Sequence, residues 1–153
     1  MRVIGKRPKV IGKYKNKVVG KFRSKLEKFC AEELKLHKID FKYEEWKVEL
    51  IPKFISSIIS YEKTAKGYVP ISPNIRSITY TPDFVGDNWI IETKGQETSD
   101  FKIKWKMFKK YIDDNSLNYT LYKPTNQKQI KETIKLIKQL NYVDNSNRAN
   151  RSV

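Results

Sequence analysis

The feature that most restricts the fold of this chain is the stretch TYTPDFVGDNWIIETKG, residues 79–95. Two apolar runs flank a Gly-Asp-Asn turn, which is the pattern of a β-hairpin. With a two-residue loop at 87–88, Asp83 lies directly opposite Glu92, and a longer loop would break this register. Because side chains alternate along a strand, Lys94 lies on the same face as Glu92. The stretch therefore predicts two acids and a lysine together at one strand end.

These three side chains suit the hydrolysis of phosphodiesters. Directly opposed residues have Cβ atoms about 4.5–5.5 Å apart, and two carboxylates that close repel each other unless a proton or a cation lies between them. Carboxylate oxygens are the ligands that Mg²⁺ prefers, and the metal can lower the pKa of a water nucleophile. A lysine beside it can hold the water or offset the charge of the phosphate. The alternative is a strand end that reaches water with a weak surface ion pair.

The spacing Glu-x-Lys is weak evidence by itself. It also occurs at residues 33–35 and 45–47. What distinguishes Glu92 is the only Pro-Asp pair of the chain, Pro82-Asp83, across the predicted turn.

The charge of the chain is strongly basic and unevenly distributed. There are 32 Lys and Arg against 17 Asp and Glu, a formal net charge of +15, and residues 1–26 contain no acid. A basic arm attracts a polyanion by releasing its condensed counterions. The pattern favours nucleic acid over a solubilising tail or an anionic lipid surface, since no amphipathic anchor accompanies the arm. The residues of the arm expected to bind nucleic acid are Arg2, Lys6, Arg7, Lys9, Lys13, Lys15, Lys17, Lys21 and Arg23.

Composition also excludes several classes of protein. No apolar run approaches the roughly 18 residues of a spanning helix, and the basic N-terminus lacks the apolar region of a signal peptide, so we expect no membrane partner. The one cysteine, Cys30, allows no internal disulfide, which suits a reducing cytoplasm, and is expected in the core. His37 is the only histidine, so no cluster of cysteines and histidines can hold zinc.

The hydrophobic pattern predicts helices and strands in mixed order. Helices are expected from Ser24 to about His37, over 100–112 and over 127–140, and strands over 41–50, 78–85, 89–93 and 117–122. Residues 51–78 are apolar but interrupted by prolines and a glycine, and no element is assigned to them. In the helix at 100–112, Trp105 and Phe108 alternate with lysines. This fits either an apolar stripe with a solvated basic face or direct contact with DNA.

Three segments carry a resemblance to a known family: FRSKLE at 22–27, FKYEEWKV at 41–48, and TYTPDF…ETKG within 79–95. In this order, after a basic arm, they resemble the phage endonuclease I family, the Holliday-junction resolvases of T-odd phages within the PD-(D/E)xK nucleases. The resemblance implies an α/β fold with a restriction-endonuclease-like mixed central sheet flanked by helices, in an intertwined homodimer that exchanges segments. From its own composition and pattern, we expect this chain to divide into a flexible basic arm at 1–21, a nuclease domain at 22–140 with an inserted segment at about 50–78, and a disordered polar tail at 141–153.

The function that the resemblance implies is the resolution of four-way and other branched DNA junctions. The enzyme would be a structure-selective, metal-dependent endodeoxyribonuclease that uses Mg²⁺, with Mn²⁺ as a substitute, and takes no small-molecule substrate. It would act in the cytoplasm, that of the host if a phage encodes it. The alternatives are a PD-(D/E)xK nuclease of the restriction or repair type that acts on linear duplex, and a non-catalytic basic DNA-binding module.

The resemblance also assigns roles to matching residues. Asp83 and Glu92 would bind the metal with the carbonyl of Thr93, Lys94 would be the catalytic lysine, and Glu27 would complete the site from the partner subunit.

A local alternative exists for Glu27. Ser24-Lys25-Leu26-Glu27 is a capping box, in which the Glu27 carboxylate would bond back to the Ser24 amide. Glu44 and Glu45 are left out of the catalytic set.

The chain departs from the family between Val48 and Tyr80, where it is longer than the usual connection. This insertion could thicken the bridge between subunits, add a hairpin that contacts DNA, or alter the exchange. After Gly95 the family's basic helix is kept, and the lysines there that are expected to bind DNA are Lys102, Lys104, Lys106, Lys109 and Lys110.

Overall fold

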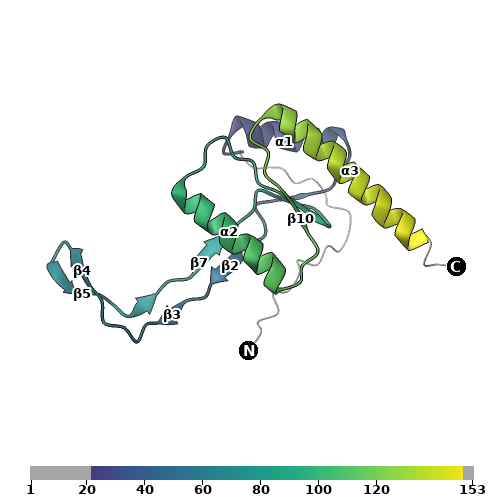
Figure 1. Cartoon of the computed structure of the whole chain (residues 1–153). Coiled ribbons are helices and arrows are strands. Elements are labelled where there is room, and N and C mark those ends of the chain that lie inside the picture. Colours follow the sequence, from purple (N-terminus) through teal and green to yellow (C-terminus); the bar gives the residue numbers. More distant parts are fainter. Residues whose placement is uncertain (1–21, 150–153) are drawn as a thin grey trace.

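The computed structural model describes residues 22–149, with side chains through residue 142 (Figure 1). The predicted basic arm at 1–21 and the last residues, 150–153, lie outside this range. The helices are α1 (Lys25–Leu36), α2 (Ser99–Asp114) and α3 (Gln127–Ala149). The strands are β1 (Lys42–Tyr43), β2 (Val48–Ile51), β3 (Phe54–Ile55), β4 (Tyr61–Thr64), β5 (Gly67–Pro70), β6 (Asn74–Ile75), β7 (Ile78–Tyr80), β8 (Phe84–Val85), β9 (Trp89–Ile91) and β10 (Thr120–Tyr122).

A mixed four-stranded sheet, ordered β1-β8-β9-β10, forms the centre of the body. β8 is antiparallel to β1 and β9, whereas β10 is parallel to β9. Phe84, Trp89 and Ile91 pack on one face against α1 and α3. Val85 and Ile90 pack on the other face against α2. Because successive strand residues point to opposite faces, the continuous apolar run of β9 contributes to both layers. The predicted mixed sheet with flanking helices is confirmed.

The first two helices begin and pack as the sequence predicts. Ser24 is the N-cap of α1 and His37 its C-cap, and the helix buries Cys30 in the core. In α2, Trp105 is 7% exposed and Phe108 is fully buried. These two aromatic residues therefore belong to the apolar stripe of the helix, not to a surface that contacts DNA.

The third helix is longer than predicted. It was expected over 127–140 with a disordered tail at 141–153, but α3 continues to Ala149. No proline or glycine follows Pro124, and asparagine and serine cost a helix interior well under about 1 kcal/mol each. Within residues 22–149 no helix combines the length and apolar character needed to cross a membrane.

Two of the predicted strands are divided between sheets. The strand expected at 41–50 is interrupted after Tyr43, where Glu44 takes a φ of 48° and Trp46 turns inward onto Phe108, with ring centroids 5.9 Å apart. The strand expected at 78–85 is interrupted at Pro82, which cannot donate to a ladder. In both cases one half pairs in the central sheet and the other half enters a separate pair, β2 with β7.

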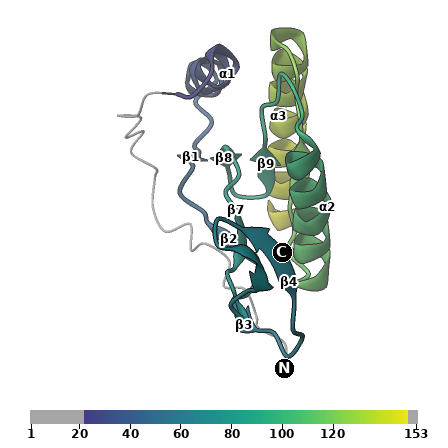
Figure 2. The same ribbon diagram turned by 90° about the vertical axis from the view of Figure 1, so that its left-hand side faces the viewer.

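The unassigned segment 51–78 forms a long two-stranded arm. Beyond the pair of β2 with β7, β3 pairs with β6 and β4 pairs with β5, all antiparallel. The arm projects from the body at the end opposite α1, as Figures 1 and 2 both show. The turn between β4 and β5 ends at Gly67, whose φ of 105° favours glycine. The arm has little core of its own, and its exposed large apolar residues are Phe54, Ile55, Ile58, Ile59, Tyr61, Tyr68, Ile75 and Ile78.

Candidate functional site

The hairpin of β8 and β9 brings the two predicted acids together. Phe84 pairs with Ile91, and the Gly86 N–H donates to the Trp89 carbonyl at 2.9 Å. The predicted two-residue loop at 87–88 is therefore confirmed, and the next step of the register places residue 83 opposite residue 92. A glycine is needed at residue 86, because a Cβ there would overlap the Trp89 indole.

Asp83 and Glu92 are buried carboxylates with several hydrogen-bond donors. Asp83 is 8% exposed and Glu92 is 2% exposed. The Asp83 Oδ2 accepts from the Thr93 N–H and the Thr93 Oγ1, both at 2.8 Å. The Tyr80 hydroxyl donates to Glu92 Oε2 at 2.6 Å, and Lys94 Nζ donates to Glu92 Oε1 at 3.3 Å. These donors stabilise the charged forms against the cost of burial.

Burial dominates the acid–base behaviour of the pair. Burial and the charge of Glu92 raise the pKa of Asp83 from 3.8 to about 7, against the opposing hydrogen bonds from Thr93. Burial also raises the pKa of Glu92, although Tyr80 and Lys94 oppose it. The two carboxylates together therefore bind a proton more tightly than exposed acids do. A cation that binds between them would displace this proton.

Lys94 is held between the acids and helix α2. Its side chain is 32% exposed, and its Nζ lies 4.4 Å from the centroid of the Phe101 ring. A cation over an aromatic face is attracted by the ring quadrupole. The structure therefore confirms that Lys94 shares the side of Glu92, and it adds Phe101 as a second contact that fixes the ammonium group.

Glu27 belongs to the capping box at the start of α1, whose N-cap is Ser24, and it also contacts β1. The Glu27 N–H donates to Ser24 Oγ at 3.1 Å, and Ser24 Oγ donates to Glu27 Oε1 at 2.9 Å. Glu27 Oε2 accepts from the Arg23 N–H at 3.1 Å and from the Tyr43 hydroxyl at 2.5 Å. The capping role is present, although the backbone amide bound is that of Arg23 and not that of Ser24. Tyr43 pairs with Phe84, the residue after Asp83, so this helix start lies on the Asp83 side of the sheet.

The oxygen donors available to a metal come from two strands. Within the part of the chain whose side chains are described, no set of three or more His, Cys, Asp or Glu side chains is arranged to hold a metal. Asp83 and Glu92 supply two carboxylates. Just past the ends of β9 and β10, the Lys94 N–H donates to the Pro124 carbonyl. The N–H and C=O of Thr93 therefore face the opposite side, where the N–H donates to Asp83. Two carboxylates and one carbonyl fit Mg²⁺, which usually keeps several waters.

Tyr80, Phe101 and Tyr43 were not among the predicted site residues. Each supports a predicted one: Tyr80 binds Glu92, Phe101 contacts Lys94, and Tyr43 binds Glu27. The available signal was that a tyrosine in a buried strand needs a partner for its hydroxyl. Sequence gave no indication of which partner each ring would meet.

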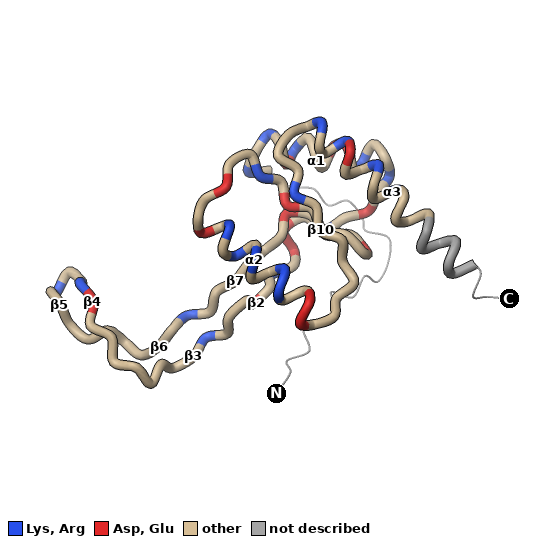
Figure 3. The backbone as a smooth tube through the Cα atoms, viewed as in Figure 1, with Lys and Arg blue, Asp and Glu red and all other residues tan. Residues whose placement is uncertain are grey.

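The basic residues expected to bind nucleic acid are only partly within the described range. Those from Arg2 to Lys21 lie outside it, and Arg23 pairs with Glu44 at 3.2 Å. Figure 3 shows the lysines distributed along α2, and none of them belongs to the buried stripe of the helix. Lys104 and Lys110 pair with acids one turn away in the same helix, whereas Lys102, Lys106 and Lys109 are exposed.

Comparison with known proteins gives two matches. Over 87 residues the chain is 38% identical to Endonuclease I of Escherichia phage T7. The matched region covers 56% of this chain and 44% of the phage protein. The chain thus spans less than half the length of this relative. No solved structure matches the chain. The second match is to the family described as "Protein of unknown function (DUF1064)" and runs over residues 11–136. Because this match covers most of the sequence, the chain belongs to the DUF1064 family.

Proposed function

We propose that this chain is a divalent-metal-dependent endodeoxyribonuclease of the PD-(D/E)xK type that cuts four-way and other branched DNA junctions. The observation that carries the proposal is the buried pair of Asp83 and Glu92, in which burial and the neighbouring charge raise the pKa of Asp83 to about 7. The net charge of +15 and the similarity to T7 Endonuclease I support DNA as the substrate. A site of this kind suits a reaction in which a cation must enter.

Asp83, Glu92 and the carbonyl of Thr93 would hold Mg²⁺, or Mn²⁺ in its place. When bound, the metal supplies Lewis-acid stabilisation of the phosphate and lowers the pKa of a water. Thr93 fixes the Asp83 carboxylate through two hydrogen bonds, and Tyr80 fixes the Glu92 carboxylate through one. The carboxylates are therefore oriented before any substrate binds, which lowers the reorganisation needed during reaction.

Lys94 supplies the positive charge of a side chain in the proposed mechanism. Its ammonium lies between the Glu92 carboxylate at 3.3 Å and the Phe101 ring at 4.4 Å. Because an ammonium group has three N–H donors, Lys94 can donate to the attacking water or to a phosphate oxygen while it also donates to Glu92. Phe101 limits the rotamers of the side chain, so the ammonium stays at the strand end where the scissile phosphate would bind.

Glu27 is proposed as the fourth member of the site in a homodimer with two sites. Within one chain it already adds to the negative potential at Asp83. An exchange of α1 and β1 between two subunits would keep the contact with Tyr43, because both residues move together. The residues after β1, where Glu44 has a φ of 48°, would then form the hinge.

Cleavage of a four-way junction with and without Mg²⁺ tests the proposed function. We expect paired nicks near the crossover that depend on the metal, and no nicks with Asp83→Ala or Lys94→Ala, while junction affinity stays close to that of the wild type. Asp87→Ala removes an exposed acid of the same hairpin and is the matched control. Wild-type turnover by Asp83→Ala would refute the site. Equal cutting of linear duplex would favour a restriction or repair nuclease, and binding without cleavage under any divalent ion would favour a DNA-binding module.

Subunit mixing tests the origin of Glu27. Glu27→Ala and Asp83→Ala chains are refolded together, and the heterodimer is isolated by two different affinity tags. If Glu27 acts across subunits, each heterodimer contains one complete site and recovers nicking of one strand. If isolated heterodimers stay inactive, Glu27 serves its own chain, as the contacts within one chain also allow.

A further inference from the structure

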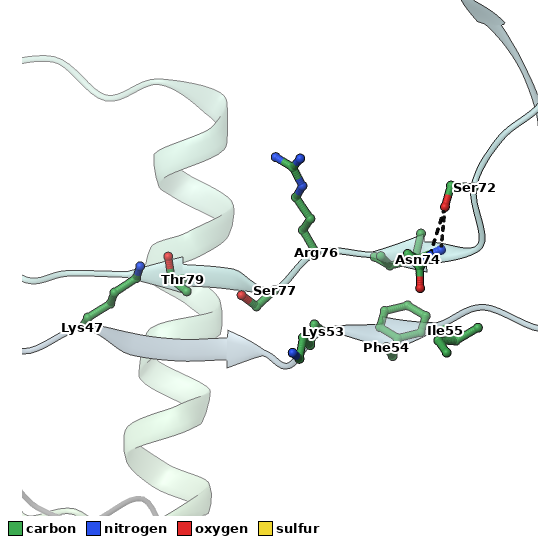
Figure 4. A pocket seen from close by; sticks show the side chains of 10 residues that line it. Lys47, Lys53, Phe54, Ile55, Ser72, Asn74, Arg76, Ser77 and Thr79 are labelled. Carbon is green, nitrogen blue, oxygen red and sulfur yellow. Dashed lines mark hydrogen bonds between the residues drawn. The ribbon is translucent and has the colours of Figure 1, made fainter.

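The base of the two-stranded arm contains an open groove of about 880 Å³. It is lined from both sides of the arm, including residues of β3 and β6 (Figure 4). We call this the arm-base groove and define it by Lys47, Lys53 and Phe54 on one strand and Asn74, Arg76 and Thr79 on the other. None of these residues takes part in the acidic site of β8 and β9.

The arm-base groove is strongly cationic. Lys47, Lys53 and Arg76 line it, and no acid does. All three are exposed, and among the residues with described side chains none of them has an ion-pair partner, unlike Lys104 and Lys110 on α2. In Figure 4 the Arg76 guanidinium points away from both strands, whereas the Lys47 ammonium extends toward Thr79. Positive groups without internal partners are available to an external anion.

One acid stands near the arm-base groove. Glu49 pairs with Thr79 across the ladder, so it lies on the same face as that lining residue. Three cations against one acid leave a net positive surface. Glu49 also provides an internal control, since its removal should strengthen the binding of an anion.

The rest of the lining suits a nucleotide chain better than a small anion. Phe54 is 49% exposed and Ile75 is 36% exposed, so apolar surface lies beside the cations. Asn74 adds an amide, held near Ser72 by hydrogen bonds of 3.3 Å. Phosphates pair with lysine and arginine, and sugars or unstacked bases pack on aromatic and apolar side chains. The groove is also open to solvent, as the binding of a polymer requires.

We infer that the arm-base groove binds the sugar–phosphate backbone of one DNA arm next to the cut site. This inference rests on the proposed function. Arg76 and Tyr80 lie on one extended segment, four residues apart, which is about 13 Å at roughly 3.3 Å per residue. Tyr80 binds Glu92, so the Arg76 end of the groove lies about four nucleotide spacings from Tyr80 at roughly 3.4 Å per nucleotide. A duplex cut at the site would pass over the base of the arm.

A second copy of this chain is the competing occupant. The apolar side chains of the arm would favour it, but the cations of the groove would then face another chain with a net charge of +15. Like charges brought into one interface are destabilising. The charge therefore favours DNA.

The test compares two charge-matched double variants in DNA binding. Junction affinity is measured by fluorescence anisotropy in Ca²⁺ over a series of salt concentrations for the wild type, Lys53→Gln/Arg76→Gln, and Lys63→Gln/Lys66→Gln. Both pairs remove two charges from the arm, but only the first pair lines the groove. We expect the groove variant to bind more weakly and the slope of log K against log salt to fall by roughly 1 per lost contact. The tip variant should change the slope much less, and Glu49→Gln should bind more tightly than the wild type.

Hydroxyl-radical footprinting of the same complexes gives the location. The groove variant should lose protection about four nucleotides from the cut, whereas the tip variant should keep it. If both double variants lower the slope equally, or if the groove variant binds like the wild type, the inference is wrong while the proposed function stands. If the groove variant instead changes the sedimentation mass and leaves DNA affinity unchanged, the occupant is a second copy. Failure of the wild type to bind any junction would refute the proposed function itself.

Discussion

Replacing Asp83 with asparagine should stabilise the metal-free protein at alkaline pH. Asp83 is 8% exposed, and its Oδ2 accepts from the Thr93 N–H and Oγ1 at 2.8 Å. An amide oxygen can accept the same two hydrogen bonds, so Asp83→Asn removes the charge and keeps the shape. The variant therefore avoids the cost of burying the Asp83 charge and the repulsion between that charge and Glu92.

The size of the effect follows from the pKa. The rise from 3.8 to about 7 corresponds to about 4 kcal/mol at roughly 1.36 kcal/mol per pKa unit. Because Glu92 shares the repulsion and titrates with Asp83, we expect about half of this, ~2 kcal/mol, in the variant. The folded chain binds this proton more tightly than the unfolded chain does. The stability that the proton on Asp83 contributes is therefore fully present below pH 4, falls as the pH rises toward 7, and is lost above that.

Urea denaturation in EDTA at several pH values between 4 and 8.5 measures this difference. The free energy of unfolding of Asp83→Asn should exceed that of the wild type at pH 8 and match it near pH 4. Asp87→Asn, at an exposed position of the same hairpin, should show no pH-dependent difference. Addition of Mg²⁺ should stabilise the wild type alone and reduce the gap. A variant that is less stable than the wild type at pH 8, or a gap that does not depend on pH, would refute the reasoning.

Three further predictions concern residues that support the site. Tyr80→Phe removes the donor to Glu92 Oε2, so the pKa of Glu92 should rise further and the acidic limb of the cleavage-rate profile should move to higher pH. Gly86→Ala forces a Cβ into the Trp89 indole and should lower the free energy of unfolding by about 1–3 kcal/mol in a denaturant titration. Ser24→Ala should lower the free energy of unfolding by about 1 kcal/mol and leave cleavage intact. Glu27→Gln should fold but not cleave DNA. Equal cleavage activity of these two variants would count against a catalytic Glu27.

The parts of the fold that sequence could predict are those set by neighbours along the chain. The Gly-Asp-Asn turn determines the register of β8 and β9, and with it the approach of Asp83 to Glu92. Ser24 marks the start of α1 because a cap acts within one helical turn. These local rules predicted the acidic pair, Lys94 and the first two helices at nearly their observed positions, and they predicted the start of α3 but not its end.

The parts that sequence could not predict depend on residues far apart in the chain. FKYEEWKV alternates like one strand, but Trp46 packs against Phe108 and Tyr119, and that contact bends the chain between two sheets. The strands of the two-stranded arm are held by ladder hydrogen bonds, and most of their side chains are exposed. Their sequence therefore lacks the alternation of buried and exposed residues that identifies a strand. The contact of Phe101 with Lys94 depends on the packing of α2 against the sheet.

The two-stranded arm at 51–78 is attached to the body in a way that lets its length vary without changing the acidic site. Val48 and Tyr80 pair across the ladder and are 2% and 7% exposed, so the core clamps both strands at one rung. The residues between Val48 and Tyr80 therefore form a loop whose two ends are held together. Doubling the length of such a loop costs only about 0.6 kcal/mol of closure entropy. Arms of different reach could therefore be fitted to the same body without moving Tyr80 or the carboxylate it binds. The footprint on a substrate and the geometry of the acidic pair can thus be changed independently.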